Sequence, residues 1–142
     1  MSLDLKDLEF FATCLPGFEA TLAEEIQSFG IKRTRPLGGG VAFFGTAGEA
    51  ELVCLWTRVA SRVMAVVGRI DVADADELYA KVFALPWEEL VAPGASIAVR
   101  ARGTNEQLRN SQFTAMKVKD ALCDRMRTKL GVRPNVDPRN AD

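Results

Sequence analysis

Arginine and amide side chains crowd into one short stretch of the chain, RARGTNEQLRNSQ, at residues 100–112. Successive side chains of an extended strand point to opposite faces, so Arg100 and Arg102 would project together from one face. Arg109 stands at the start of a long helical pattern, where the helix dipole disfavours a cation. A phosphate bound between Arg109 and the free N–H groups of the first turn would remove that conflict. The alternative is a hydrated loop without a ligand.

Positive charge is concentrated in the same part of the chain. Residues 1–99 contain 8 Lys or Arg and 14 Asp or Glu, a balance of −6, whereas residues 100–142 contain 10 and 5, a balance of +5. A segregated basic segment is the electrostatic pattern of a nucleic-acid-binding surface. A helix that simply exposes a basic face to water is the competing interpretation.

The candidate nucleic-acid contacts in this segment carry cationic, amide or hydroxyl groups, which suit phosphate and sugar oxygens. Phe113 is the one aromatic residue among residues 100–142, so stacking of bases on a row of aromatic rings is not expected there. The candidates are Arg100, Arg102, Thr104, Asn105, Arg109, Asn110, Gln112, Lys117 and Lys119.

Lys119 has an unexpected position on the helix predicted for residues 108–130. A projection at about 100° per residue puts it inside the apolar stripe. Such a lysine extends to solvent, pairs with a buried acid, or points into a groove that a ligand fills, and extension to solvent is the commonest outcome. The stripe predicted to be buried consists of Ala115, Leu122, Met126 and Leu130, with Val118 and Cys123 at its edges.

Other chemistry has little support. The chain has no histidine, which excludes triads that need an imidazole base. Its three cysteines, Cys14, Cys54 and Cys123, are far apart, so we expect buried or half-buried free thiols rather than a zinc site or a disulfide framework. The acidic pairs at 24–25 and 88–89 are interpreted as solvated helix faces. We therefore assign no catalytic, cofactor-binding or metal-binding residue.

The elements that would position the basic segment fall into two units, at residues 1–71 and 72–142. Thr46 and Glu49 form a predicted capping box, and the helix after it carries Leu52, Leu55, Trp56 and Val59 on one face. Glycines 38–40 are interpreted as a hairpin turn, because no phosphate-loop sequence follows them. The first unit reads as strand 8–14, helix 17–30, hairpin 31–46, helix 47–60 and strand 61–71, the β-α-β-β-α-β order of a ferredoxin-like α+β fold.

The second unit begins at the acidic, alanine-rich DVADADEL. We predict one helix over 76–90, or two that are split by Pro86, then a strand over 96–103, the long helix, and a loop-like segment over 131–142. One strand cannot form a sheet, so we expect that the chain stops before this domain is complete or that strands come from elsewhere. No signal peptide or membrane span is evident, which predicts a cytoplasmic protein.

The segments FFATCLPGFEATLAEEI, GGGVAFFG, IAVRARGTNEQLRNSQFTAMKVKDAL and RPNVDPRNAD resemble the N-terminal part of a bacterial methyltransferase family. That family methylates guanine N2 in 23S ribosomal RNA. The resemblance implies an N-terminal ferredoxin-like domain followed by the first part of a THUMP domain, an α/β RNA-binding module. Arg139 and Asn140 of the closing motif join the candidate RNA contacts.

The resemblance also implies what this chain leaves to the rest of the enzyme. The family's catalytic domain, which binds S-adenosylmethionine, has an Asn-Pro-Pro-Tyr-type motif that is absent here. We therefore expect RNA, most of all 23S rRNA, as partner, together with a methyltransferase domain in cis, and neither a cofactor nor catalysis in this chain. Two alternatives are the THUMP region of a tRNA thiolation or methylation enzyme, and a ferredoxin-like protein-interaction module.

Overall fold

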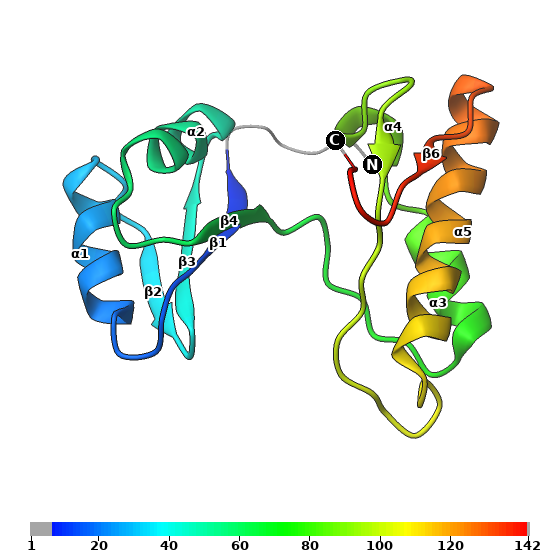
Figure 1. Cartoon of the computed structure of the whole chain (residues 1–142), viewed down its shortest axis with the longest axis horizontal. Coiled ribbons are helices and arrows are strands. Elements are labelled where there is room, and N and C mark those ends of the chain that lie inside the picture. The colour runs from blue at the N-terminus through cyan, green and yellow to red at the C-terminus, as the bar shows by residue number, and fades with distance from the viewer. Residues whose placement is uncertain (1–6, 142) are drawn as a thin grey trace. The chain divides into compact units, whose positions relative to one another are not determined.

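The computed structural model describes residues 7–141 as two compact units, one ending at Arg69 and the other beginning at Ile70 (Figure 1). The β-α-β-β-α-β order that was predicted for the first unit is confirmed. Its elements are β1 (Leu8–Thr13), α1 (Glu19–Ser28), β2 (Thr34–Leu37), β3 (Gly40–Gly45), α2 (Ala47–Trp56) and β4 (Arg62–Ala65).

The four strands of the first unit form one antiparallel sheet in the order β2-β3-β1-β4. Both helices cover the same face of this sheet (Figure 1). Apolar residues at alternate strand positions meet apolar residues of the helices and form the core, because every second strand residue points to the same face. The fully buried members are Ala12, Leu22, Ile26, Ile31, Val41, Phe43 and Val53.

Helix α2 confirms the predicted capping box but not the predicted face. The Thr46 hydroxyl accepts a hydrogen bond from the Glu49 N–H (3.1 Å), and the Glu49 carboxylate accepts one from the Thr46 N–H (3.0 Å). The buried residues are Ala50 and Val53, however, whereas the Trp56 side chain is 62% exposed. Apolar residues lie all around this helix, so their spacing did not identify the side that faces the core.

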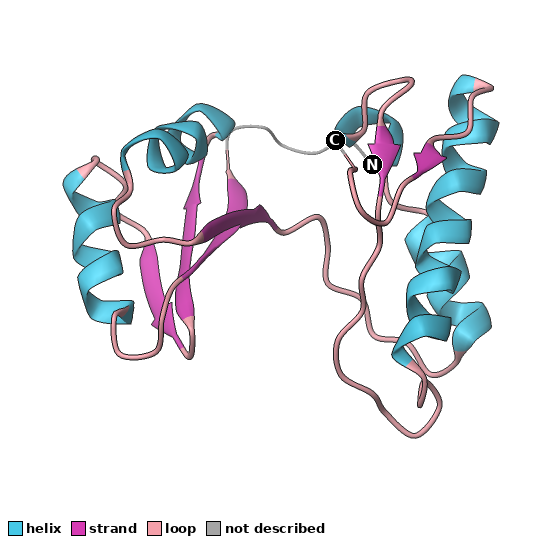
Figure 2. Ribbon diagram, in the orientation of Figure 1, coloured by secondary structure: helices cyan, strands magenta, loops and turns pink. Residues whose placement is uncertain are grey.

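The second unit contains α3 (Ala75–Phe83), α4 (Trp87–Leu90), β5 (Ser96–Ile97), α5 (Ser111–Leu130) and β6 (Asn135–Val136). Helices α3 and α5 lie side by side, and Pro86 separates α3 from α4 (Figure 2). Strands β5 and β6 pair in parallel, with Ile97 opposite Val136. The predictions of a single strand and of a loop throughout 131–142 are therefore wrong.

Among residues 7–141, the strand predicted over 96–103 pairs with another strand only at its start. Strand β6 offers two partner residues, and the Asp137 N–H adds one bond to the Ile97 carbonyl (3.0 Å). Beyond this point the exposure still alternates, with Val99 and Ala101 less exposed than Arg100 and Arg102. The predicted alternation of side chains between two faces therefore also holds for residues 99–102, which follow β5.

Helix α5 begins at Ser111, close to the expected start, and its buried side differs in part from the prediction. Leu122, Cys123 and Met126 are buried together with Ala121, which had not been assigned to the core. Leu130 is 40% exposed. The contacts with α3 and α4 decide which side is buried, and these contacts cannot be read from the helix itself. No helix among residues 7–141 is long and apolar enough to cross a lipid bilayer.

Candidate nucleic-acid interface

A groove of about 300 Å³ lies between the segment after β5 and the first turns of α5. Arg100 and Arg102 line one wall, and Ser111, Gln112 and Ala115 line the other. Both arginines are exposed. The structure thus brings three predicted contacts, Arg100, Arg102 and Gln112, to one concave surface, where two guanidinium groups and an amide can donate hydrogen bonds.

A turn near the C-terminus lies beside the same surface. The guanidinium of Arg100 donates a hydrogen bond from Nη2 to the Pro138 carbonyl oxygen (3.4 Å). The Asp137 carboxylate accepts hydrogen bonds from the backbone N–H groups of Arg139 (3.0 Å) and Asn140 (3.1 Å), which shapes this turn. Arg139 and Asn140 are exposed. They directly follow Pro138, so the hydrogen bond from Arg100 brings them near it across about forty residues of sequence.

The start of α5 is capped by the chain itself. The Asn110 side-chain oxygen accepts hydrogen bonds from the N–H groups of Gln112 (2.9 Å) and Phe113 (3.3 Å). Arg109 donates from Nε to the Glu106 carbonyl oxygen (3.0 Å). The prediction that an anion takes up the N–H groups of the first turn is therefore wrong for these two donors, because an asparagine N-cap already satisfies them.

Asn105 has a comparable local role. Its side-chain oxygen accepts hydrogen bonds from the N–H groups of Gln107 (3.0 Å) and Leu108 (2.6 Å), so it orders the loop that leads to α5. Thr104 is exposed in the same loop. These residues shape the approach to the groove but do not line it.

The two predicted lysines of α5 lie outside the groove. The Lys117 ammonium is 5.8 Å from the centroid of the Phe113 ring, a cation–π contact. The Lys119 ammonium is 2.9 Å from the Asp120 carboxylate. The predicted pairing with a buried acid is not observed, because the Asp120 side chain is 46% exposed.

Ser111 lines the groove beside Gln112 but was not among the candidate contacts that the sequence indicated. Its only signal was its place in the first turn of α5. Sequence reasoning also assigned Cys54 to a buried or half-buried position. Cys54 is exposed on α2, whereas Cys14 and Cys123 are buried.

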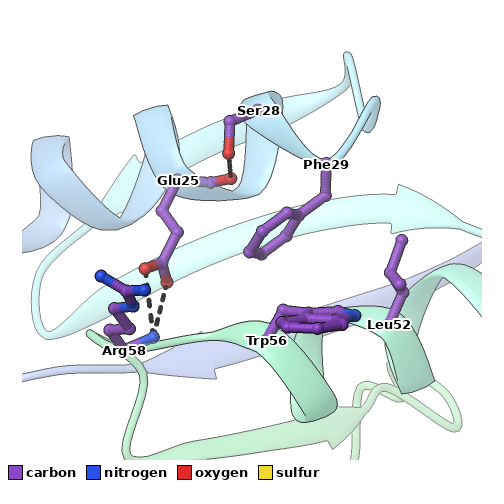
Figure 3. Close-up of a pocket in the computed structure, with 6 residues that line it drawn as sticks. All are labelled: Glu25, Ser28, Phe29, Leu52, Trp56 and Arg58. Atoms are coloured by element: carbon purple, nitrogen blue, oxygen red, sulfur yellow. Dashed lines mark hydrogen bonds between the residues drawn. The ribbon is translucent and has the colours of Figure 1, made fainter.

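A second hollow, of about 480 Å³, lies between α1 and α2 (Figure 3). The Phe29 ring and the Trp56 indole face each other across it (Figure 3). The Glu25 carboxylate is held in its wall by the Thr57 hydroxyl and by the Arg58 N–H (3.1 Å). The interpretation of residues 24–25 as a purely solvated face is therefore wrong for Glu25, which fixes the chain after α2.

The fold and the groove define a two-unit α/β protein whose second unit presents a basic surface. The chain belongs to the THUMP domain family, whose model matches residues 72–142. A model described as the RlmL ferredoxin-like domain matches residues 9–64. These two matches confirm both the fold class and the family resemblance that was derived from the sequence.

Among the relatives, a ribosomal RNA large subunit methyltransferase K/L from Cellvibrio japonicus is 40% identical over 134 residues. The match covers 94% of this chain and 18% of that protein, so the chain spans less than a fifth of its length.

Two solved structures have a similar fold. The crystal structure of a predicted N6-adenine-specific DNA methylase from Listeria monocytogenes has a TM-score of 0.83 at 26% identity, over 96% of this chain and 39% of that one. A second structure, determined as a complex with SAH, has a TM-score of 0.83 at 23% identity, over 96% and 40%.

Proposed function

We propose that this chain is the RNA-binding region of an S-adenosylmethionine-dependent methyltransferase that modifies guanine N2 in 23S ribosomal RNA in the bacterial cytoplasm. Residues 1–71 would form its ferredoxin-like domain and residues 72–142 its THUMP domain. The family match and the name of the Cellvibrio relative support the proposal. The observation that carries it is that Arg100 and Arg102 line one groove and that Arg100 also bonds the 138–140 turn.

This groove holds RNA through its backbone. Arginine guanidinium groups form charge-assisted hydrogen bonds with phosphate oxygens. The Gln112 amide and the Ser111 hydroxyl add donors for phosphate or ribose. Thr104, Asn105, Arg109, Lys117 and Lys119 contribute through loop shape and local charge rather than from the groove wall, and Asn110 caps α5. The region positions the RNA, and a separate catalytic domain of the enzyme carries out the methyl transfer.

The two hollows described above, among residues 7–141, do not suit S-adenosylmethionine. The residues that line the Arg100 groove include no carboxylate that could accept hydrogen bonds from ribose hydroxyls. The hollow between α1 and α2 does contain Glu25, but Thr57 and Arg58 already engage that carboxylate. The name of the methyltransferase relative and the SAH-bound structural neighbour support cofactor binding elsewhere in the whole protein.

The decisive experiment compares RNA binding by the wild-type chain and by an Arg100→Ala/Arg102→Ala variant in fluorescence anisotropy over 50–300 mM KCl. The probes are fragments of 23S rRNA and a tRNA. We expect weaker binding and a salt slope that is smaller by about 1–2, because each phosphate contact contributes about 0.7–0.9 to the slope. Arg127→Ala is the control, since Arg127 is 66% exposed on α5 and does not line the groove.

Equal slopes for all three proteins would exclude the groove as the binding site. A preference for tRNA over 23S rRNA would replace the rRNA enzyme by a tRNA-modifying one.

A further inference from the structure

The face of the first sheet that is opposite α1 and α2 carries an aromatic ring on each of its two central strands. In the β1–β3 register Phe11 is opposite Ala42, and Glu9 is opposite Phe44. Phe11 and Phe44 are therefore diagonal neighbours on one face, and such neighbours lie about 7–8 Å apart in an antiparallel pair.

Each of these rings belongs to a Phe-Phe doublet that the strand divides between two faces. Phe10 and Phe43, the other members, point into the core and stack with ring centroids 5.3 Å apart. The core therefore uses one ring of each doublet, and the second ring serves no packing role with the helices. Phe11 and Phe44 are half-buried.

The outward rings lie along the sheet surface. A Cβ built on Gly40 would come within 2.8 Å of the Phe11 ring, so that ring lies over a residue without a side chain. The guanidinium carbon of Arg33 is 4.4 Å from the centroid of the Phe44 ring. Met64 of β4, which is 41% exposed, is opposite Phe11 and extends the apolar strip.

Arginines border these rings. Arg35 of β2 is opposite Ala42 of β3, and Arg62 of β4 is opposite Thr13 of β1. Both arginines therefore belong to the face that carries Phe11 and Phe44. Neither side chain forms an ion pair with any residue from 7 to 141. We call this surface the sheet platform; it consists of Phe11, Phe44, Met64, Arg33, Arg35, Arg62 and Arg69.

The charge of the unit is divided between its two sides. Arg33 pairs with Asp7 (3.0 Å) and Arg69 with Glu9 (2.5 Å). With the four platform arginines and these two carboxylates, the platform side has a net charge of +2. The other residues of 7–69 contain two cations and five acids, a balance of −3. The positive side is thus the side with the outward aromatic rings. The cations are Lys32 and Arg58, and the acids are Glu19, Glu24, Glu25, Glu49 and Glu51.

We propose that the sheet platform binds single-stranded RNA, with one unpaired base stacked on Phe11, a second on Phe44 in place of the Arg33 guanidinium, and the phosphates held by Arg35 and Arg62. Base stacking on aromatic side chains next to cations is the general way in which proteins hold single strands. A duplex keeps its base faces inside the helix, so it cannot use these rings. The surplus of arginine also matches a polyanion better than an apolar protein surface.

This site is chemically different from the groove at Arg100. The groove offers donors for phosphate and sugar, whereas the platform offers ring faces for bases. Binding at the platform does not depend on the proposed function of the groove. Single-stranded RNA should therefore still bind when Arg100 and Arg102 are replaced.

The test uses the 142-residue chain with Arg100→Ala/Arg102→Ala as background and fluorescence anisotropy as readout. The probes are a fluorescein-labelled 12-nucleotide oligouridine and a fully paired 12-base-pair RNA duplex. In this background we expect Phe44→Leu to weaken oligouridine binding about tenfold and to leave duplex binding within about twofold. Trp56→Leu, which removes an exposed ring from the helix side, should change neither.

Arg35→Glu/Arg62→Glu provides a second variant at exposed positions, so the test stands even if Phe44→Leu impairs folding. It should also abolish most oligouridine binding, and a matching circular dichroism melt checks its fold. Photo-crosslinking with a 4-thiouridine oligonucleotide should label peptides that contain Phe11 or Phe44. Oligouridine binding that is unchanged in both variants, or crosslinks confined to residues 100–141, would overturn the proposal.

Discussion

Arg125 of α5 and Glu88 of α4 form a two-point ion pair, with distances of 2.7 Å from Nη2 to Oε1 and 2.9 Å from Nε to Oε2. The side chains are only 14% and 20% exposed. Arg125 also donates a hydrogen bond to the Phe83 carbonyl oxygen (3.3 Å). One cation of the basic segment therefore joins three helices and is not available to RNA. The interpretation of residues 88–89 as a solvated face is wrong for Glu88.

This ion pair predicts a stability that depends on pH. The hydrogen bonds from Arg125 lower the pKa of Glu88 to about 2, whereas an unfolded glutamate titrates near 4.3. Because the folded pKa is the lower one, the stabilisation is present above about pH 4.5 and is lost as the pH falls toward 2. Urea unfolding should show a gap of roughly 2 kcal/mol between wild type and Glu88→Gln at pH 7, narrowing steadily below pH 4.5. A gap that does not change with pH would contradict this account.

Asn110 should matter for stability rather than for RNA. Asn110→Ala removes the cap from α5 and should cost about 1 kcal/mol in the free energy of unfolding, whereas Asn110→Asp should keep most of it. RNA binding by the folded variant should change less than twofold. Gln112→Ala is the matched comparison, because Gln112 lines the groove and has no capping role. It should weaken binding at unchanged stability, and the reverse pattern would show that the two roles are exchanged.

Gly40 should tolerate no side chain. A Cβ there would lie 2.2 Å from the Ala12 carbonyl oxygen, and backbone in a central strand pair cannot move away cheaply. Gly40→Ala should therefore destabilise the protein by about 2–3 kcal/mol and lower its Tm. Gly38→Ala, in the same hairpin, meets nothing within 4 Å and should leave the Tm nearly unchanged. Similar Tm values for the two variants would disprove the close contact.

The three thiols should react at different rates. Cys54 is exposed, whereas Cys14 and Cys123 are buried, and burial raises the pKa of Cys14. Because the thiolate is the reactive form, DTNB should modify one thiol quickly in the native protein at pH 8 and three in guanidinium chloride. Cys54→Ser should abolish the fast phase. A fast phase of two or three thiols would mean that the cores open readily.

The first unit could be predicted almost completely because its signals are local. Thr46 and Glu49 indicate the start of a helix, and the glycines at 38–40 indicate a turn. Strand-like segments also alternate with helical ones along the sequence. The core side of α2 could not be predicted, because Leu52, Leu55 and Trp56 are as apolar as the buried Val53. In the second unit, strands of two residues leave no periodicity to detect, so β6 was missed.

The sequence by itself determined the separation of charge, the order of elements in the first unit and the absence of histidine chemistry. These properties depend on composition or on neighbours within a few residues. Only the tertiary structure decided which cations share a surface. Parallel pairing of Ile97 with Val136 brings Arg100 beside the 138–140 turn, and packing of α5 on α4 turns Arg125 inward. Contacts between segments about forty residues apart depend on how the whole chain packs, and no local pattern records them.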